Sequence, residues 1–189
     1  MQNPYAARSH KEMQDVLMSP DATGPEIHYY MIRGGNKKTN ITVWEPGKVG
    51  DEYIKSYGHY HVGDLEETYT ILQGTGIIIL QKRKVDASGN PIDNEIESFE
   101  TKSVKAGDKV FIPSGMGHLA INTGTTWFVT SDTSPVNFDE KNAVAAPGHA
   151  DYAPFKKLHG AAYYVVEKNG EPSLVKNPNY KTVPPASIK

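Results

Sequence analysis

The sequence predicts an all-β protein folded as a small sandwich or barrel. After the first 20 residues, short runs rich in Ile, Val, Tyr and Thr alternate with clusters of Gly, Pro, Asn and Asp. Many short strands separated by closely spaced turns are typical of this fold class. QGTG at 73–76 and DASGNP at 86–91 have the composition of hairpin turns. The expected strands are residues 41–44, 51–56, 67–73, 76–84, 97–102, 109–112, 119–123, 126–132 and 162–167.

One short helix is expected near the start of the chain. Ser9 followed by Glu12 is a capping-box pattern, in which each side chain bonds a free backbone N–H of the first helical turn. Met13, Val16 and Leu17 then fall on one helical face. The sequence therefore predicts an amphipathic helical turn that packs on the β structure.

The length of 189 residues is about that of one domain. We expect a single domain over 1–189, with the barrel core at about 40–132. Segment 133–161 is rich in Pro and Gly and is expected to be a long irregular loop. Residues 162–189 are expected to form terminal strands and a tail, which after Pro172 is polar, Pro-rich and extended.

Composition narrows the function classes. The net charge of −2 predicts no nucleic-acid partner, and the absence of any run of 18 apolar residues predicts no membrane partner. Cysteine is absent, so a metal would have to be held by His, Asp and Glu. The N-terminus lacks a secretory pattern, and the expected location is the cytoplasm.

The residues that point to chemistry are three histidines and one glutamate. His59 and His61 are one residue apart, so on a strand both side chains face the same side. An isolated HxH is a weak signal, and unrelated polar strand histidines are the alternative. Glu67 opens the next expected strand, and GDKVFIPSGMGHLAIN delivers His118 after a Pro/Gly turn. Together they would form a compact three-histidine, one-carboxylate metal site.

These two stretches resemble the paired motifs of the cupin superfamily, whose fold is a double-stranded β-helix (a small β-barrel or jelly roll). The resemblance implies His59, His61, Glu67 and His118 as metal ligands. The gap between His61 and Glu67 is one residue longer than the commonest cupin spacing. Glu66 would restore that spacing but would break the interval to Gly74, so Glu66 is expected to face solvent.

WEPGKVGDEYIKSYGHYH, followed by ETY and ILQGTG, is similar to the cupin-type glucose-6-phosphate isomerases known chiefly from archaea. The resemblance covers roughly residues 40–130, with a weaker echo at 148–152 and 165–170. It implies Glu67 as the catalytic residue that moves a proton between neighbouring carbons, or shapes the site for a hydride shift. The sugar-phosphate contacts that it implies are Thr42, Ser56, Gly58, Tyr69 and Tyr152.

The sequence departs from the family that it resembles at two places that concern phosphate binding. Ser134 stands where the family has an aromatic phenol, and segment 136–150 carries extra residues before the DY pair at 151–152. The remaining histidines are expected at the surface: His10, His28, His149 and His159.

The resemblance implies a metal-dependent aldose–ketose isomerase that interconverts glucose 6-phosphate and fructose 6-phosphate in glycolysis and gluconeogenesis. The expected cofactor is one divalent metal per subunit, iron(II), with Mn, Ni or Zn possible, and the expected assembly is a homodimer. One alternative is another metal-dependent cupin enzyme, either a different sugar-phosphate isomerase or an oxygenase. A second is a non-catalytic cupin that binds a sugar phosphate.

Overall fold

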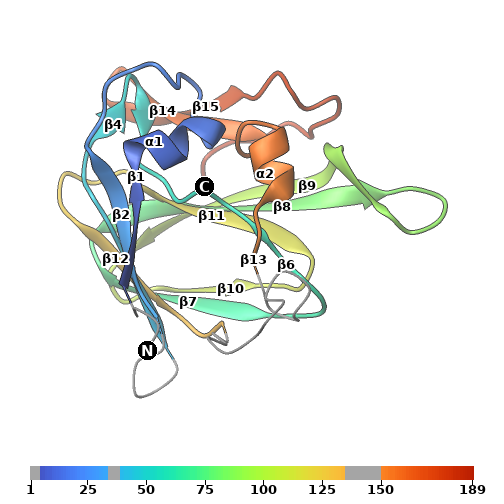
Figure 1. Cartoon of the computed structure of the whole chain (residues 1–189), viewed down its shortest axis with the longest axis horizontal. Helices are drawn as coiled ribbons and strands as arrows, with labels where there is room; N and C mark the ends of the chain where they lie inside the picture. The colour runs from blue at the N-terminus through green and yellow to red at the C-terminus, as the bar shows by residue number, and fades with distance from the viewer. Residues whose placement is uncertain (1–4, 34–38, 135–149) are drawn as a thin grey trace.

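The computed structural model describes residues 5–33, 39–134 and 150–189, and in these it forms two facing antiparallel sheets (Figure 1). The six-stranded sheet consists, in spatial order, of β1 (Tyr5–Ser9), β2 (Ile27–Ile32), β3 (Asn40–Trp44), β12 (Phe128–Asp132), β7 (Glu67–Gln73) and β10 (Lys109–Ile112). The opposite sheet consists of β11 (Met116–Asn122), β8 (Thr75–Val85) and β9 (Pro91–Lys105).

Segment 54–59 lengthens the second sheet beside β11. Backbone bridges join Lys55 to Ile121 and His59 to His118, and β6 (Tyr60–His61) continues the segment. The barrel strands pair in a nested order along the chain. β3 pairs with β12, segment 54–59 with β11, β7 with β10, and β8 with β9 as the innermost hairpin. This nested pairing across two sheets is the jelly-roll arrangement of the cupins and confirms the predicted fold class.

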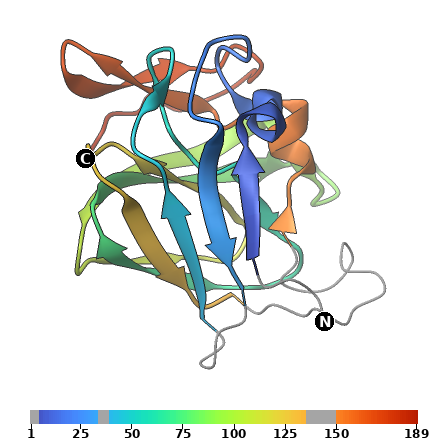
Figure 2. The same cartoon turned by 60° about the vertical axis from the view of Figure 1, so that its left-hand side comes forward.

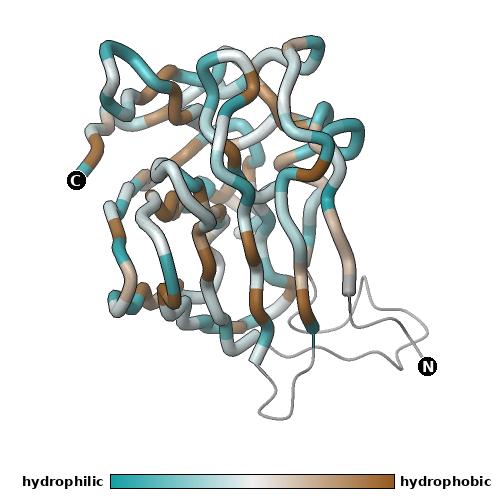
Figure 3. Tube along the Cα trace, turned by 90° about the vertical axis from the view of Figure 1, so that its left-hand side faces the viewer, coloured by the Kyte–Doolittle hydropathy of each residue, from teal (hydrophilic) through white to brown (hydrophobic). Residues whose placement is uncertain are grey.

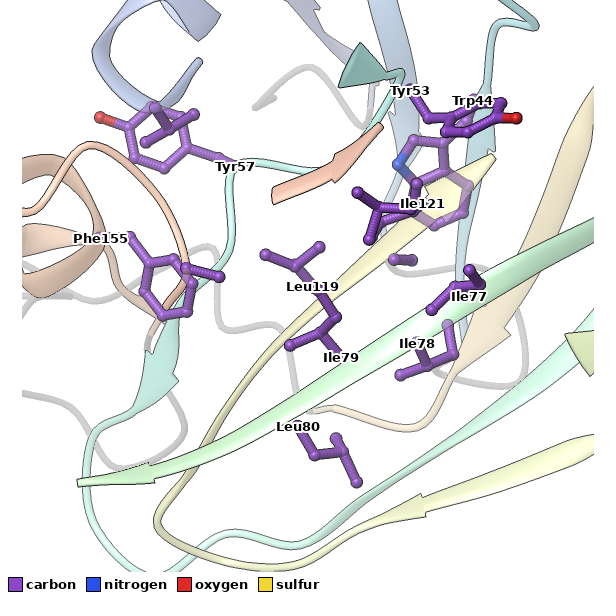
Figure 4. Close-up of a cluster of buried hydrophobic side chains, with 14 of the residues drawn as sticks. Trp44, Tyr53, Tyr57, Ile77, Ile78, Ile79, Leu80, Leu119, Ile121 and Phe155 are labelled. Atoms are coloured by element: carbon purple, nitrogen blue, oxygen red, sulfur yellow. The ribbon is translucent and has the colours of Figure 1, made fainter. Parts of the chain in front are cut away.

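The core fills the space between the sheets. In β8, residues 76–81 are all buried, because one face of the strand meets the barrel interior and the other is covered by C-terminal segments. Figure 4 shows Ile77, Ile79, Leu119 and Ile121 meeting where β8 pairs with β11. Along β3, β10 and β12, buried residues alternate with more exposed ones, as expected of strands with one buried face, and Figure 3 shows the hydropathy along the chain.

The predicted N-terminal helix is confirmed. It consists of α1 (His10–Met13) followed by the 3₁₀ turn η1 (Gln14–Val16), with Ser9 and Glu12 forming the expected capping box. Figure 2 shows β1, β2, β3 and β12 side by side with the helices at one end. No helix among the described residues is long and apolar enough to cross a membrane.

A smaller sheet lies beyond the barrel. Its strands, in spatial order, are β15 (Glu171–Lys176), β14 (Tyr163–Lys168), β5 (Glu52–Tyr53) and β4 (Lys48–Val49). β14 and β15 are terminal strands of the kind expected for 162–189, and the extended stretch expected after Pro172 begins within β15. Val175 is exposed, whereas Leu174 packs against the core, and this contact holds the hairpin to the barrel.

Two further expectations about loops are corrected. QGTG at 73–76 is not a hairpin turn, because it links β7 of one sheet to β8 of the other. Residues 150–161 of the expected long loop contain β13 (Ala150–Asp151) and α2 (Ala153–Lys157), while 135–149 lie outside the described residues. The helix begins where the Asp151 carboxylate accepts a hydrogen bond from the Ala153 N–H, and burial of Phe155 holds it in place.

The histidine prediction is wrong at one position. His159 is exposed, but His28 is only 1% exposed, because its side chain on β2 turns inward and its Nε2 lies 3.0 Å from Nδ1 of His10. His10 is half-buried, and His149 lies outside the described residues. Burial, together with the charges of His10 and Lys55, lowers the pKa of His28 to about 4.

The buried His28 predicts a defined sensitivity to acid. In the unfolded chain an imidazole titrates near pH 6.5, so the contribution of neutral His28 is complete above that pH and is lost towards pH 4. We expect this group to lower the free energy of unfolding by about 2–3 kcal/mol over that window. Urea unfolding at a series of pH values should show that the free energy of unfolding falls less steeply with decreasing pH in His28→Gln than in the wild type. The control His159→Gln, at an exposed histidine, should keep the wild-type slope, and identical slopes for all three proteins would refute the assignment.

Candidate metal centre

Four side chains from three parts of the chain converge inside one end of the barrel. One potential ligand atom from each of His59, His61, Glu67 and His118 lies within 4.8 Å of all the others. The Nε2 atoms of His59 and His61 are 3.2 Å apart, and Glu67 Oε2 lies 3.5 Å from His61 Nε2 and 3.2 Å from His118 Nε2. The predicted residues are therefore brought together, and Glu66 is exposed as expected.

The backbone explains why the imidazoles meet. His59 and His118 exchange N–H···O bonds of 3.2 and 3.0 Å, and directly opposed residues of an antiparallel pair face the same side. Their ring centroids are 4.3 Å apart, and His61 follows two residues later. Glu67 enters from the facing sheet, where it starts β7 opposite Ile112 of β10.

Gly58 sets the approach of the chain to His59. Its φ of +83° lies in the left-handed region that favours glycine, and a Cβ there would lie 2.5 Å from the Phe155 ring. Phe155 belongs to α2, so the helix packs directly against the backbone that carries the first two histidines. Tyr60, between them, points the other way, and its hydroxyl accepts a hydrogen bond of 3.0 Å from Gln81 Nε2.

The donor set fits a divalent cation. Glu67 Oε2 and His118 Nε2 are buried and have no hydrogen-bond partner among the described residues, although they face each other. Buried polar atoms without a partner are costly, and a cation between them would satisfy both. His118 Nδ1 lies 3.2 Å from the Met116 carbonyl oxygen. That oxygen can accept a hydrogen bond from Nδ1–H, which leaves Nε2 free to act as a ligand.

Electrostatics favour neutral, ligating imidazole at His61. Burial and the neighbouring His118 lower the pKa of His61, while Glu67 and a hydrogen bond to the Leu65 backbone act in the opposite direction. A neutral ring offers a lone pair to a metal ion. Imidazole suits several first-row divalent metals and carboxylate suits harder ones, so these residues could hold such an ion without selecting one.

Two of the predicted substrate contacts border the four ligands. The Tyr69 ring lies edge-on to His118 at 5.8 Å, and the Tyr152 ring lies 5.5 Å from that of His59. Burial, reinforced by Glu67 and Asp132, raises the pKa of Tyr69 well above its usual range. Its phenol therefore keeps its proton and can act as a hydrogen-bond donor.

The other predicted contacts are Thr42, Ser56 and Gly58, the last of which directly precedes His59. Thr42 is on the inner face of β3, opposite Thr130 of β12. The Ser56 hydroxyl accepts a hydrogen bond from the Ala120 N–H at 2.9 Å and so helps to join segment 54–59 to β11. Ser134 bonds Asp132 at 2.7 Å, and apart from Ala150 the 136–150 segment lies outside the described residues. The substrate roles of Thr42, Ser56, Gly58, Tyr69 and Tyr152 remain predictions.

Sequence reasoning missed Arg8. Its guanidinium carbon lies 5.5 Å from the centroid of the Tyr152 ring and 5.8 Å from that of Tyr57. Burial alone would lower the pKa of Arg8, but the hydroxyls of Tyr29 and Tyr152 outweigh it and raise the pKa. Nothing in the sequence pointed to this side chain, because YAARS carries no strand or ligand pattern.

Comparison with known proteins agrees with this geometry. Residues 28–182 match the model of the glucose-6-phosphate isomerase (GPI) family. The glucose-6-phosphate isomerase of Pyrococcus abyssi is 32% identical over 177 residues, which cover 91% of this chain and 80% of that protein. That of Thermococcus onnurineus is 31% identical over 176 residues, covering 90% and 80%.

Among solved structures, a predicted oxalate decarboxylase from Thermotoga maritima is 20% identical with a TM-score of 0.42, covering 68% of this chain and 88% of that one. The match to the family model spans most of the chain, including all four clustered residues, and the relatives are similar along nearly all of it. This chain belongs to the glucose-6-phosphate isomerase family.

Proposed function

We propose that this protein is an aldose–ketose isomerase that interconverts glucose 6-phosphate and fructose 6-phosphate. In this proposal His59, His61, Glu67 and His118 hold one divalent metal. The observation that carries it is the convergence of three imidazoles on a carboxylate oxygen, Oε2 of Glu67, which is buried and has no hydrogen-bond partner among the residues that the structure describes. Family membership supplies the reaction to which such a centre is suited.

The isomerisation moves one hydrogen between C1 and C2 and exchanges their carbonyl and hydroxyl groups. A bound divalent metal would supply Lewis-acid polarisation of the substrate carbonyl. Glu67 is the only carboxylate of the cluster, so it is the group that can take a proton from one carbon and return it to the other. The protonated Tyr69 phenol, two residues along the same strand, can donate a hydrogen bond to a substrate oxygen.

Three finer features belong to the same proposal. Iron(II) is the proposed resident ion, since a set of imidazoles and one carboxylate accepts it. A homodimer is proposed through the outer face of the six-stranded sheet, where exposed apolar side chains gather. These are Tyr30, Leu72 and Phe111, with Trp127 beside β12 and its ring 6.2 Å from that of Tyr30. The proposed setting is glycolysis and gluconeogenesis in the cytoplasm.

Removal and return of metal tests the proposal. A coupled assay from fructose 6-phosphate to glucose 6-phosphate should show no activity in chelator-treated protein and restored activity after addition of iron(II) or manganese(II). Manganese at 100 times its dissociation constant should also stabilise the fold by about 2.7 kcal/mol, seen as a higher melting temperature.

Two matched variants accompany these measurements. His61→Ala should lose both the metal-restored activity and the stabilisation by manganese, and His159→Gln should keep both. Restored metal binding without isomerisation would refute the isomerase. Oxygen consumption with iron(II), or turnover of mannose 6-phosphate alone, would instead indicate another metal-dependent enzyme. Tight sugar-phosphate binding with no turnover and no response to metal removal would indicate a binding protein.

Glu67→Gln separates proton transfer from metal binding. The amide keeps one oxygen and the shape of the side chain but cannot accept the proton, so kcat should fall by about 10²–10⁴-fold. Manganese content, measured on the same samples, should fall much less than in His61→Ala. Turnover in D₂O should place deuterium in the product of the wild-type reaction. Normal turnover by Glu67→Gln would exclude the proton-transfer role, and deuterium-free product would favour a hydride shift.

A further inference from the structure

The proposed substrate carries a phosphate dianion, and binding it inside a barrel calls for a cation. The chain has three arginines, at positions 8, 33 and 83. Arg83 stacks on Tyr60 at 3.9 Å and pairs with Asp93 at 2.7 Å, on the side of the strand away from the metal ligands. The buried Lys55 is occupied by Glu52 and by the Val16 carbonyl oxygen. Arg8 and Arg33 are the arginines that remain.

Arg8 shares a face of the six-stranded sheet with the buried Tyr29. It lies on β1 directly opposite Tyr29, whose ring is only 3% exposed, and opposed residues of an antiparallel pair share a face. At its outer end, Nη1 pairs with Glu12 at 3.2 Å, and the Glu12 carboxylate is itself fixed by the capping box. The Arg8 Nε is buried and has no hydrogen-bond partner among the described residues.

The guanidinium is also held near the metal ligands. The Tyr152 ring is near both groups, since its centroid is 5.5 Å from the Arg8 guanidinium carbon and 5.5 Å from the His59 ring. Tyr57 adds a second aromatic ring, and its backbone N–H donates to the Tyr29 hydroxyl at 3.3 Å. One aromatic ring therefore separates a fixed cation from the centre where C1 and C2 would react.

We propose that Arg8 binds the phosphate of the substrate and makes the site select phosphorylated over neutral sugars. This rests on the proposed function. An Nε–Nη edge presents two N–H donors in the geometry that a phosphate accepts, which a lysine cannot reproduce. Arg33 is the rival, but its Nη2 contacts Met31 Sδ at 3.2 Å and it lies next to residues outside the described range.

The test uses sorbitol 6-phosphate, which cannot isomerise, and sorbitol, its neutral counterpart. Calorimetry on manganese-loaded protein should show that Arg8→Gln weakens sorbitol 6-phosphate binding by about 30- to 100-fold and leaves sorbitol unchanged. The KM for fructose 6-phosphate should rise by a similar factor, with a much smaller change in kcat. Arg8→Lys should be intermediate. Arg83→Gln, which loses a stacked arginine elsewhere, and Arg33→Gln should resemble the wild type.

The proposal would be overturned if Arg8→Gln bound sorbitol 6-phosphate with wild-type affinity, or if Arg33→Gln and not Arg8→Gln lost that affinity. Melting temperature and manganese content of each variant show whether the fold and the metal centre are intact. Should Arg8→Gln not fold, wild-type affinity in Arg8→Lys would count equally against a bidentate contact. Binding and turnover separate the two proposals. Arg8-dependent phosphate binding without isomerisation refutes only the isomerase, whereas isomerisation indifferent to Arg8 refutes only this inference.

Discussion

The backbone pairing of His59 with His118 is the contact on which the metal centre depends. It joins the strand segment carrying two histidines to the one carrying the third. Neighbouring bonds extend it, from Asn122 N–H to the Ile54 carbonyl oxygen and between Ser56 and Ala120. A one-residue slip would turn the His118 ring to the opposite face of β11. The register of one short strand pair therefore decides whether the site exists.

The four ligands place a polar cluster inside an apolar barrel, and the fold must tolerate its cost. Glu67 and His118 are 3% and 0% exposed, and each has a buried atom that finds no hydrogen-bond partner in the described part of the chain. The neighbouring His61 does not neutralise the carboxylate, because burial lowers the pKa of its imidazole and keeps the ring uncharged. A divalent cation bound between Glu67 and His118 would give both atoms a partner, and its binding would therefore stabilise this end of the barrel.

The sequence predicted best the features that depend on local pattern. The limits of β7 and β10 were predicted to the residue, and the four clustered side chains were named from spacing and resemblance. The sequence did not predict the features that depend on pairing between segments far apart in the chain. YAARS has low strand propensity and becomes β1 only by pairing with β2. QGTG was recognised as a turn, but no local signal says that β8 joins the other sheet.

The proposed metal ligands and the proposed sugar-phosphate contacts Arg8 and Tyr152 come from different parts of the chain. The metal ligands come from the barrel core, where their positions are fixed by sheet register. Arg8 and Tyr152 come from β1 and from the residue that caps α2, both outside that core. The ion pair between Asp15 and Lys156, 3.1 Å long, links the N-terminal turn to α2. With Arg8 in its proposed role, changes on β1 would alter which sugar is bound, whereas changes in α2 would also reach the proposed metal ligands, because Phe155 packs on Gly58 beside His59.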